Sequence, residues 1–272
     1  MIIYSLLAVW VLLATLFSFY DLSISKQILN QNSVWAAFLE KYGMIPGLLV
    51  IFSGIYIYYS FIKQRSDVWS YLQKIVFFFV STGLILYLFD IIISNTINEN
   101  FVINNLITFL IISFCISIII FILLQIKKPV QNIIAIKYSR VVLGMALFGY
   151  VFCIQVVKTF WGRVRFKELD AAFSQFTPWY LPQGINGYDS FPSGHAAMGW
   201  MLLAILILFT NKKLWLKYSV FIIIFMYAII LTLSRVIIGA HYASDVLFGS
   251  FFMIFTFLFF YKRNEDGLKE EK

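Results

Sequence analysis

The sequence predicts an all-α membrane protein, a polytopic bundle of about eight transmembrane helices. Composition is the first reason: of 272 residues, 61% are hydrophobic and only 12% are charged, and the mean hydropathy is +0.87. A soluble domain carries roughly twice that charged fraction. The second reason is the recurrence of apolar runs about 20 residues long, which is the length a helix needs to cross a bilayer.

Each apolar run is expected to be one span, and the polar stretches between them are loops. The expected spans lie near residues 2–20, 44–62, 70–94, 101–126, 137–157, 194–210, 215–235 and 242–261. The first has no basic start and no small-residue cleavage site before Asp21, so a retained span is expected rather than a signal peptide. The stretch 33–43 is too short and too polar to span, and an interfacial or re-entrant helix is expected there.

Basic residues alternate between the loops, which predicts the orientation in the membrane. Four regions on one side carry the positive charges: Lys63 and Arg65; Lys127, Lys128, Lys137 and Arg140; Lys212, Lys213 and Lys217; Lys262 and Arg263. Cytoplasmic loops hold such an excess of Lys and Arg. Both termini are therefore expected in the cytoplasm of a plasma-membrane protein, with the loops at 158–193 and 236–241 together on the outer face.

The net charge of +8 does not indicate nucleic-acid binding, because the basic residues lie in these loops and form no basic stripe or stacking platform. The two cysteines, Cys115 and Cys153, both fall inside apolar spans. We expect them to be packing residues rather than a disulfide.

The outer loop at 158–193 breaks the charge rule, and it begins with the first of three polar clusters. The cluster KTFWGRVRF (158–166) holds Lys158, Arg163 and Arg165. Lys158 and Arg165 are seven residues apart, so they either share one face of a helix or converge in a loop. Cations that snorkel at the end of a span are the structural alternative.

The second cluster, PSGH at 192–195, opens an apolar run. Pro192 suits the first turn of a helix, and Ser193 and Gly194 then present backbone N–H groups at the helix N-terminus, a position that favours anions. His195 lies in the same turn. A capped helix start with one interfacial histidine is the structural alternative.

The third cluster, SRVIIGAHYASD (234–245), contains Arg235, His241 and Asp245. A cation near the end of an apolar span is costly unless it is paired. His241 and Asp245 are spaced i, i+4, so the carboxylate can accept a hydrogen bond from the imidazole and leave the other ring nitrogen as a nucleophile. A purely structural His–Asp pair is the alternative.

Taken together, the clusters provide two imidazoles, a supporting carboxylate, several cations and a helix N-terminus on one predicted face. This set suits phosphoryl transfer, in which cations neutralise phosphate oxygens and a leaving oxygen is protonated. The sequence has no cluster of ligands for a transition metal and no Walker or kinase glycine-rich motif. No cofactor or metal is therefore expected.

In order and spacing the three clusters resemble the signature of the type-2 phosphatidic acid phosphatase superfamily. That signature reads Lys-x6-Arg-Pro, Pro-Ser-Gly-His and Ser-Arg-x5-His-x3-Asp. Here it is met by Lys158-x6-Arg165, by residues 192–195, and by Ser234-Arg235-x5-His241-x3-Asp245. The one departure is Phe166 in place of the proline, which changes loop stiffness rather than charge.

The resemblance implies a role for each matching residue. His241 attacks phosphorus, Asp245 orients it, and His195 protonates the leaving group and then activates water. The phosphoryl oxygens are held by Lys158, Arg165, Arg235, Ser193 and the Gly194 N–H. Arg163 lies outside the strict signature and is only a possible substrate contact.

The resemblance also implies a lipid phosphate as substrate, and the charge pattern of the loops predicts a site on the extracytoplasmic face of the bilayer. Undecaprenyl diphosphate, phosphatidylglycerol phosphate and phosphatidic acid remain open as substrates. A phosphotransferase of the same superfamily, and a non-catalytic transporter or scaffold that binds lipid phosphates, remain open as alternatives. The expected division is N-terminal helices 1–136, a catalytic core 137–261 and a cytoplasmic tail 262–272.

Overall fold

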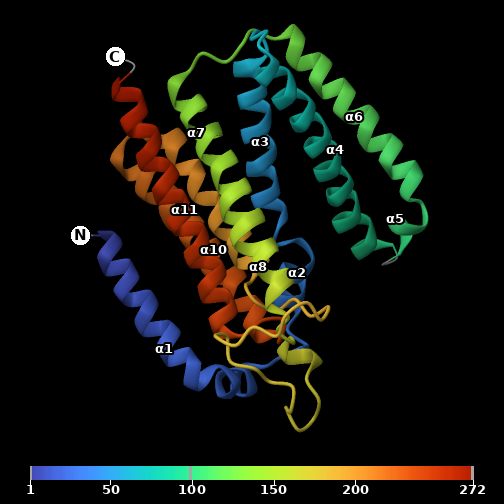
Figure 1. Ribbon diagram of the computed structural model, residues 1–272, viewed down its shortest axis with the longest axis vertical. Helices are drawn as coiled ribbons and strands as arrows, with labels where there is room; N and C mark the ends of the chain where they lie inside the picture. The colour runs from blue at the N-terminus through green and yellow to red at the C-terminus, as the bar shows by residue number, and fades with distance from the viewer. Residues whose placement is uncertain (1, 98–99, 271–272) are drawn as a thin grey trace.

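A computed structural model describes residues 2–97 and 100–270 of the chain, and in these residues the regular structure is helical throughout (Figure 1). The helices are α1 (Ile2–Ile28), α2 (Val34–Tyr42), α3 (Ile45–Ile62), α4 (Val68–Thr96), α5 (Phe101–Asn104), α6 (Leu106–Ile126), α7 (Ile133–Gly144), the π-helical η1 (Met145–Val156), α8 (Val157–Trp161), the short 3-10 turn η2 (Phe166–Glu168), α9 (Gly194–Met201), the 3-10 stretch η3 (Leu202–Phe209), α10 (Leu214–Ile237) and α11 (Ala243–Glu270). The predicted all-α class is confirmed.

Seven helical segments of the described chain are long and apolar enough to cross a membrane. The sixth expected span, near 194–210, is the shorter apolar segment Gly194–Phe209. It is formed by α9 and η3, which follow one another without a break. The stretch 33–43, for which an interfacial or re-entrant helix was expected, contains the helix α2. With α3 it makes up one of the seven apolar segments, Val34–Ile62, and its interfacial or re-entrant placement stays a prediction.

Two helices are longer than the hydropathy of their ends predicted. The first was expected to stop at residue 20, yet α1 continues to Ile28, because the polar side chains of Asp21 and Ser25 are buried against the protein. The expected tail is largely helix, since α11 continues to Glu270. Residues 271 and 272 of that tail lie outside the described residues.

The C-terminal helices together with α3 form the centre of the bundle, and the other N-terminal helices lie around it. Buried side chains from α3, α7, α9, η3, α10 and α11 build one continuous apolar core. The α4–α6 hairpin packs on the side of α3, and α1 lies along α11 on another side (Figure 1). Outward faces of α1, α4 and α6 expose large apolar side chains, as expected for surfaces in contact with lipid.

The irregular segment 169–193 covers one end of the bundle, and the free ends of α1 and α11 point away from it (Figure 1). Two indoles attach this segment to the helices. Trp161 donates to the carbonyl of Trp179 (2.7 Å), and Trp179 donates to the carbonyl of Ala14 (3.1 Å) and to Ser18 Oγ (3.0 Å) on α1. The segment is therefore fixed on α1, and Trp179 serves as a structural anchor.

Candidate active site

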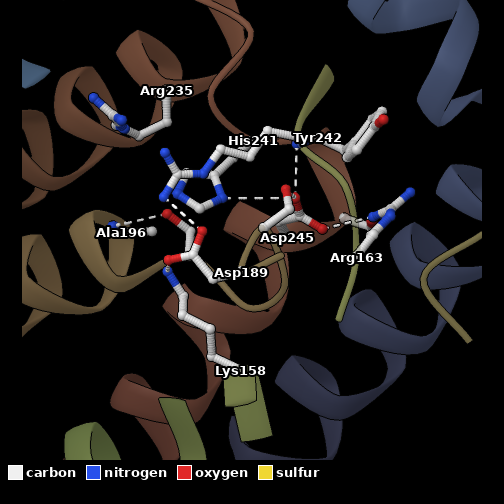
Figure 2. Close-up of polar contacts among 12 residues, drawn as sticks. Lys158, Arg163, Asp189, Ala196, Arg235, His241, Tyr242 and Asp245 are labelled. Carbon is white, nitrogen blue, oxygen red and sulfur yellow. Dashed lines mark hydrogen bonds and ion pairs between the residues drawn. The ribbon is translucent and has the colours of Figure 1, made fainter. Parts of the chain in front are cut away.

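The three sequence motifs meet beneath segment 169–193. The first motif begins in α8 and continues into the loop after it. The second motif lies at the start of α9, and the third runs from the end of α10 through the turn into the start of α11. Figure 2 shows Lys158 and Arg235 on opposite sides of the His241 ring, with Asp245 beyond it. Residues that are far apart in the sequence thus form one polar site in an apolar bundle.

A glycine ends α8 between the cations of the first motif. Gly162 has a φ of +59°, and a Cβ at this position would overlap the carbonyl oxygen of Gly184. This left-handed residue is a common way to end a helix. Arg165 therefore lies beyond the helix, and it converges with Lys158 from the loop rather than sharing a helix face with it.

His241 and Asp245 form the pair that their i, i+4 spacing predicts. His241 Nδ1 lies 3.6 Å from Asp245 Oδ2, and both side chains are buried. The distance is longer than a hydrogen bond, but Nδ1 is the nitrogen that faces the carboxylate. The backbone N–H of His241 donates to the carbonyl of Arg235 (3.1 Å). This arrangement directs Nε2 away from Asp245.

Asp245 is held in place from several directions. Its Oδ2 accepts hydrogen bonds from Ser190 Oγ (2.5 Å) and from the backbone N–H of Tyr242 (2.9 Å). Its Oδ1 accepts from Arg163 Nη1 at 2.6 Å. A carboxylate with this many donors stays ionised and does not rotate. The orientation of His241 is therefore set by a rigid partner.

Arg163 lies behind Asp245, on the side away from His241 (Figure 2). Its side chain is 1% exposed. Its further contacts are with Asp21 Oδ2 (Nη2, 3.0 Å), Ser244 Oγ (Nη1, 2.8 Å) and the carbonyl of Thr177 (Nε, 2.9 Å). The guanidinium expected as a possible substrate contact thus bridges two buried carboxylates, Asp21 on α1 and Asp245 on α11.

The surroundings of His241 favour a neutral imidazole. Burial is the main cause that lowers the pKa of His241 to about 4. The charges of Lys158 and Arg235 also lower this pKa, whereas Asp245 raises it. A neutral ring has the lone pair that a nucleophile needs. At neutral pH His241 is therefore in the protonation state that can attack an electrophile.

Lys158 and Arg165 share an acidic partner, Asp189. Arg165 Nη2 lies 2.7 Å from Asp189 Oδ1, and Lys158 Nζ lies 3.4 Å from Asp189 Oδ2. Burial favours a higher pKa for Asp189, but Lys158 and Arg165 outweigh it and hold the pKa below its usual range. The two cations of the first motif are thus bridged by a carboxylate that is ionised at neutral pH.

Arg235 pairs with an acid outside the three motifs. Its Nη2 lies 3.1 Å from Glu40 Oε1 on α2, and Lys167 Nζ lies 3.1 Å from the same oxygen. Arg235 Nε and Nη1 are buried without a protein hydrogen-bond partner. The backbone carbonyl of Glu40 lies 3.0 Å from His195 Nε2. Since a carbonyl can only accept, Nε2 carries the proton in this contact and Nδ1 is the other titratable nitrogen.

Ser193 is the N-cap of α9. Its Oγ accepts from the backbone N–H of Ala196 at 3.4 Å, and its own N–H donates to the carbonyl of Asp245 at 3.0 Å. The Ser193 N–H is therefore already used within the protein, whereas an anion-binding role was expected for it. A Cβ on Gly249 would overlap the Ser193 carbonyl oxygen, so α11 and this turn need the glycine to approach each other closely.

Five polar residues of the site were not anticipated from the sequence as site residues: Asp21, Glu40, Asp189, Ser190 and Ser244. The strongest signal for them was an acid at the end of an apolar run, Asp21 in α1, since a buried acid in such a helix needs a partner. Glu40 lies in the more polar stretch 33–43 and is 34% exposed, so it gave no such signal. Asp189 and Ser190 directly precede the second motif. Ser244 donates to Asp21 and receives from Arg163, which no spacing rule predicts.

Within residues 3–97 and 100–264, no three His, Cys, Asp or Glu side chains lie together in a way that could hold a metal ion. In a comparison with protein families, residues 137–267 match the PAP2 superfamily. This segment belongs to the PAP2 superfamily. The matched PAP2 segment contains all three motifs, and membership supports a phosphatase-type function on lipid phosphates in general. Comparison with curated proteins and with solved structures gave no match.

Proposed function

We propose that the protein is an integral membrane phosphatase that hydrolyses a lipid phosphate monoester or diphosphate through a phosphohistidine. One observation carries the proposal: a buried, neutral His241 oriented by Asp245 stands among Lys158, Arg165 and Arg235. A nucleophile with a supporting carboxylate suits covalent catalysis. The cations suit the negative charge that develops on phosphoryl oxygens.

In the first step, His241 Nε2 attacks phosphorus, and the bond from phosphorus to the lipid oxygen breaks. The leaving oxygen takes the proton on Nδ1 of His195, whose ring enters this step as an imidazolium and leaves it neutral. In the second step, His195 accepts a proton from a water molecule, whose oxygen attacks phosphorus. The P–N bond breaks, orthophosphate is released, and both histidines return to their starting states.

The contacts of His195 support its role as acid and base. Its Nε2 donates to the fixed carbonyl of Glu40, which holds the ring and leaves Nδ1 as the nitrogen that exchanges a proton with substrate and water. A positioned imidazole of this kind contributes 10²–10⁴-fold to proton transfer in enzymes generally, as an order of magnitude. Neither step uses a metal ion, so hydrolysis is expected to persist in EDTA.

The phosphoryl site is formed chiefly by Lys158, Arg165 and Arg235, with the Ser193 hydroxyl and the Gly194 N–H at the start of α9. Two nitrogens of Arg235, Nε and Nη1, have no protein partner, and its side chain is 3% exposed. Buried donors of a charged group are costly unless a ligand satisfies them, so these groups favour a site for anions. Arg163 belongs to the support of Asp245 rather than to this set.

Placement at the extracytoplasmic face rests on the distribution of basic loops. In a cysteine-free background, with Cys115 and Cys153 replaced by alanine, the exposed loop residue Ile185 is changed to cysteine. A thiol reagent that does not cross the membrane should label this cysteine in intact cells. Labelling only after the cells are opened would contradict the outer placement.

A lipid substrate agrees with the apolar surroundings of the site. Next to Glu40, helix α2 exposes Val34, Trp35 and Phe38, and a shallow apolar hollow runs from α2 to Ile230 of α10. An amphiphile can lie with its head group at the cations and its tail along such a surface. Undecaprenyl diphosphate, phosphatidylglycerol phosphate and phosphatidic acid all have this form.

The proposal is tested by phosphate release from those three lipids by purified protein in EDTA, with His241→Ala and the loop variant Asp170→Asn compared. Release by the wild type and by Asp170→Asn, and none by His241→Ala, is expected. Activity in His241→Ala would refute the nucleophile, and loss in EDTA would refute the metal-free route. Transfer of phosphate to a second lipid would indicate a phosphotransferase, and binding without turnover a transporter or scaffold.

A further inference from the structure

Asp189 lies inside the group of cations that the proposed function assigns to the substrate phosphate. It directly precedes Ser190 in segment 169–193, and Figure 2 shows its carboxylate between Lys158 and the His241 ring. One carboxylate oxygen faces Arg165 Nη2 at 2.7 Å, and the other faces Lys158 Nζ at 3.4 Å. Two anionic oxygens thus bridge two cations, as two oxygens of a phosphoryl group would.

The exposure of these side chains sets Asp189 apart from the structural acids of the site. Asp189 is 47% exposed, whereas Lys158 is 14% exposed. By contrast, Asp21 and Asp245 are buried and accept several hydrogen bonds each. No hydrogen bond or ion pair of the described residues holds the Asp189 carboxylate apart from those to the cations Lys158 and Arg165. Asp189 is therefore a ligand of the two cations rather than a member of the buried hydrogen-bond network that contains Asp21 and Asp245.

We propose that Asp189 is an internal ligand of the phosphoryl site, whose carboxylate occupies Lys158 and Arg165 at rest and leaves them when a phosphoryl group binds. This inference rests on the proposed function only in its assignment of the two cations to the phosphate. It adds a residue outside the three motifs, and it makes substrate binding an exchange of one anion for another.

The exchange needs only a side-chain rotation. The next residue, Ser190, is fixed by its N–H to the carbonyl of Arg163 (2.9 Å) and by its hydroxyl to Asp245. The Asp189 side chain projects from this anchored backbone and is 47% exposed, so another χ1 rotamer can move its carboxylate away from the cations. The loop and the start of α9 stay in place while this happens.

Because Asp189 competes for Lys158 and Arg165, it weakens the binding of every external anion by the same factor. That factor is set by the ratio of the population in which Asp189 contacts the two cations to the population in which it does not. Ion pairs with partly buried cations favour the occupied state, since charge-assisted hydrogen bonds are roughly twice as strong as neutral ones. Asp189→Asn keeps the shape but removes the charge. We expect it to bind inorganic phosphate about tenfold more tightly than the wild type does.

The test measures inorganic phosphate binding to the purified full-length protein by isothermal titration calorimetry. The variants are Asp189→Asn, Asp189→Ala and the control Asp170→Asn. Asp170 lies in the same loop, is fully exposed to solvent and accepts from Ser174, so its variant matches the change in net charge. Both Asp189 variants should bind phosphate about tenfold more tightly, and the control should stay within about twofold of the wild type.

Unchanged or weaker phosphate binding in Asp189→Asn and Asp189→Ala would overturn the inference and would make Asp189 a residue that positions the cations. This outcome is separate from failure of the proposed function. A wild type that releases phosphate from lipids while its Asp189 variants bind phosphate no more tightly refutes the inference alone. Tighter binding in the variants of a protein that hydrolyses no lipid phosphate refutes the proposed function alone.

Discussion

Replacing Arg163 by glutamine should disable the site without touching the phosphoryl cations. The guanidinium makes two short ion pairs, to Asp245 Oδ1 at 2.6 Å and to Asp21 Oδ2 at 3.0 Å, and is 1% exposed. Arg163→Gln leaves two buried carboxylates that face each other without a cation. Removal of one partner from a buried ion pair typically costs about 3–5 kcal/mol, and we expect Arg163→Gln to fall in this range.

Asp21→Asn provides the second arm of a double-mutant cycle. On its own it removes one charge-assisted contact, for which about 1.5–3 kcal/mol is typical. Combined with Arg163→Gln it removes one of the two unpaired carboxylates, so the double variant should be more stable than the sum of the single effects predicts. Coupling energies between residues in contact are about 0.5–3 kcal/mol, and a value above 1 kcal/mol is expected here.

Two assays follow the cycle: thermal unfolding in detergent, and phosphate release resolved into kcat and KM. Because Arg163 acts on Asp245 and not on the phosphoryl group, kcat should fall in Arg163→Gln and KM should change little. Additive stabilities of the two substitutions would refute the bridging role of Arg163. A rise in KM at unchanged kcat would instead make Arg163 a contact of the substrate.

Three further outcomes are expected. Glu40→Ala, assayed by phosphate release, should lower kcat/KM about tenfold, because the Arg235 guanidinium loses its partner at 3.1 Å; an unchanged kcat/KM would contradict this. The unfolded chain binds a proton at its histidines below a pKa of about 6.5, whereas folded His241 does so only below about 4, so the melting temperature should fall as the pH falls from about 6.5 to 4. That fall should be smaller in His241→Asn, and an equal fall would refute a buried neutral ring. Gly249→Ala should lose about 1–3 kcal/mol of stability, measured by thermal unfolding, and most phosphate release, because its methyl group overlaps the Ser193 carbonyl; a stable, active variant would contradict this.

The helical class and most span positions could be predicted from the sequence, because a bilayer requires long apolar helices. The ends of the helices could not. Hydropathy placed the end of the first span at residue 20, since Asp21 and Ser25 are polar, but both side chains face the protein interior. Whether a polar residue at the end of a span faces water or a buried partner depends on tertiary packing, which the local pattern does not contain.

The three motifs indicated which side chains form the site, because each motif has a fixed spacing along the chain. Their acidic partners were harder to predict. Glu40 reaches Arg235 from α2, and Asp21 reaches Arg163 from α1, across sequence separations that no local rule covers. The N-terminal helices, which lie outside the matched segment 137–267, thus contribute two carboxylates to the polar network of the site.

The different partners of Arg163 and Arg165 could not be predicted from the local sequence either. In the sequence, Arg163 and Arg165 differ by one intervening valine. In the structure, the left-handed Gly162 ends α8 just before them, and Arg165 pairs with Asp189 while Arg163 pairs with the buried carboxylates Asp21 and Asp245. The spacing does not predict this division, because residues i and i+2 of an extended segment lie on the same face.

The most direct test of the central claim is detection of the phosphohistidine. His195→Ala should still form the covalent intermediate from a lipid diphosphate, whose leaving phosphate needs no proton to depart, but should hydrolyse it slowly because no base activates the water. The variant is mixed with a lipid diphosphate that carries ³²P in its terminal phosphate, denatured in alkali, which preserves phosphohistidine, and mapped by peptide mass spectrometry. The account predicts label on His241, and none when His241 is also replaced by alanine. Label on another residue, or none while the wild type releases phosphate from the same lipid, would contradict it.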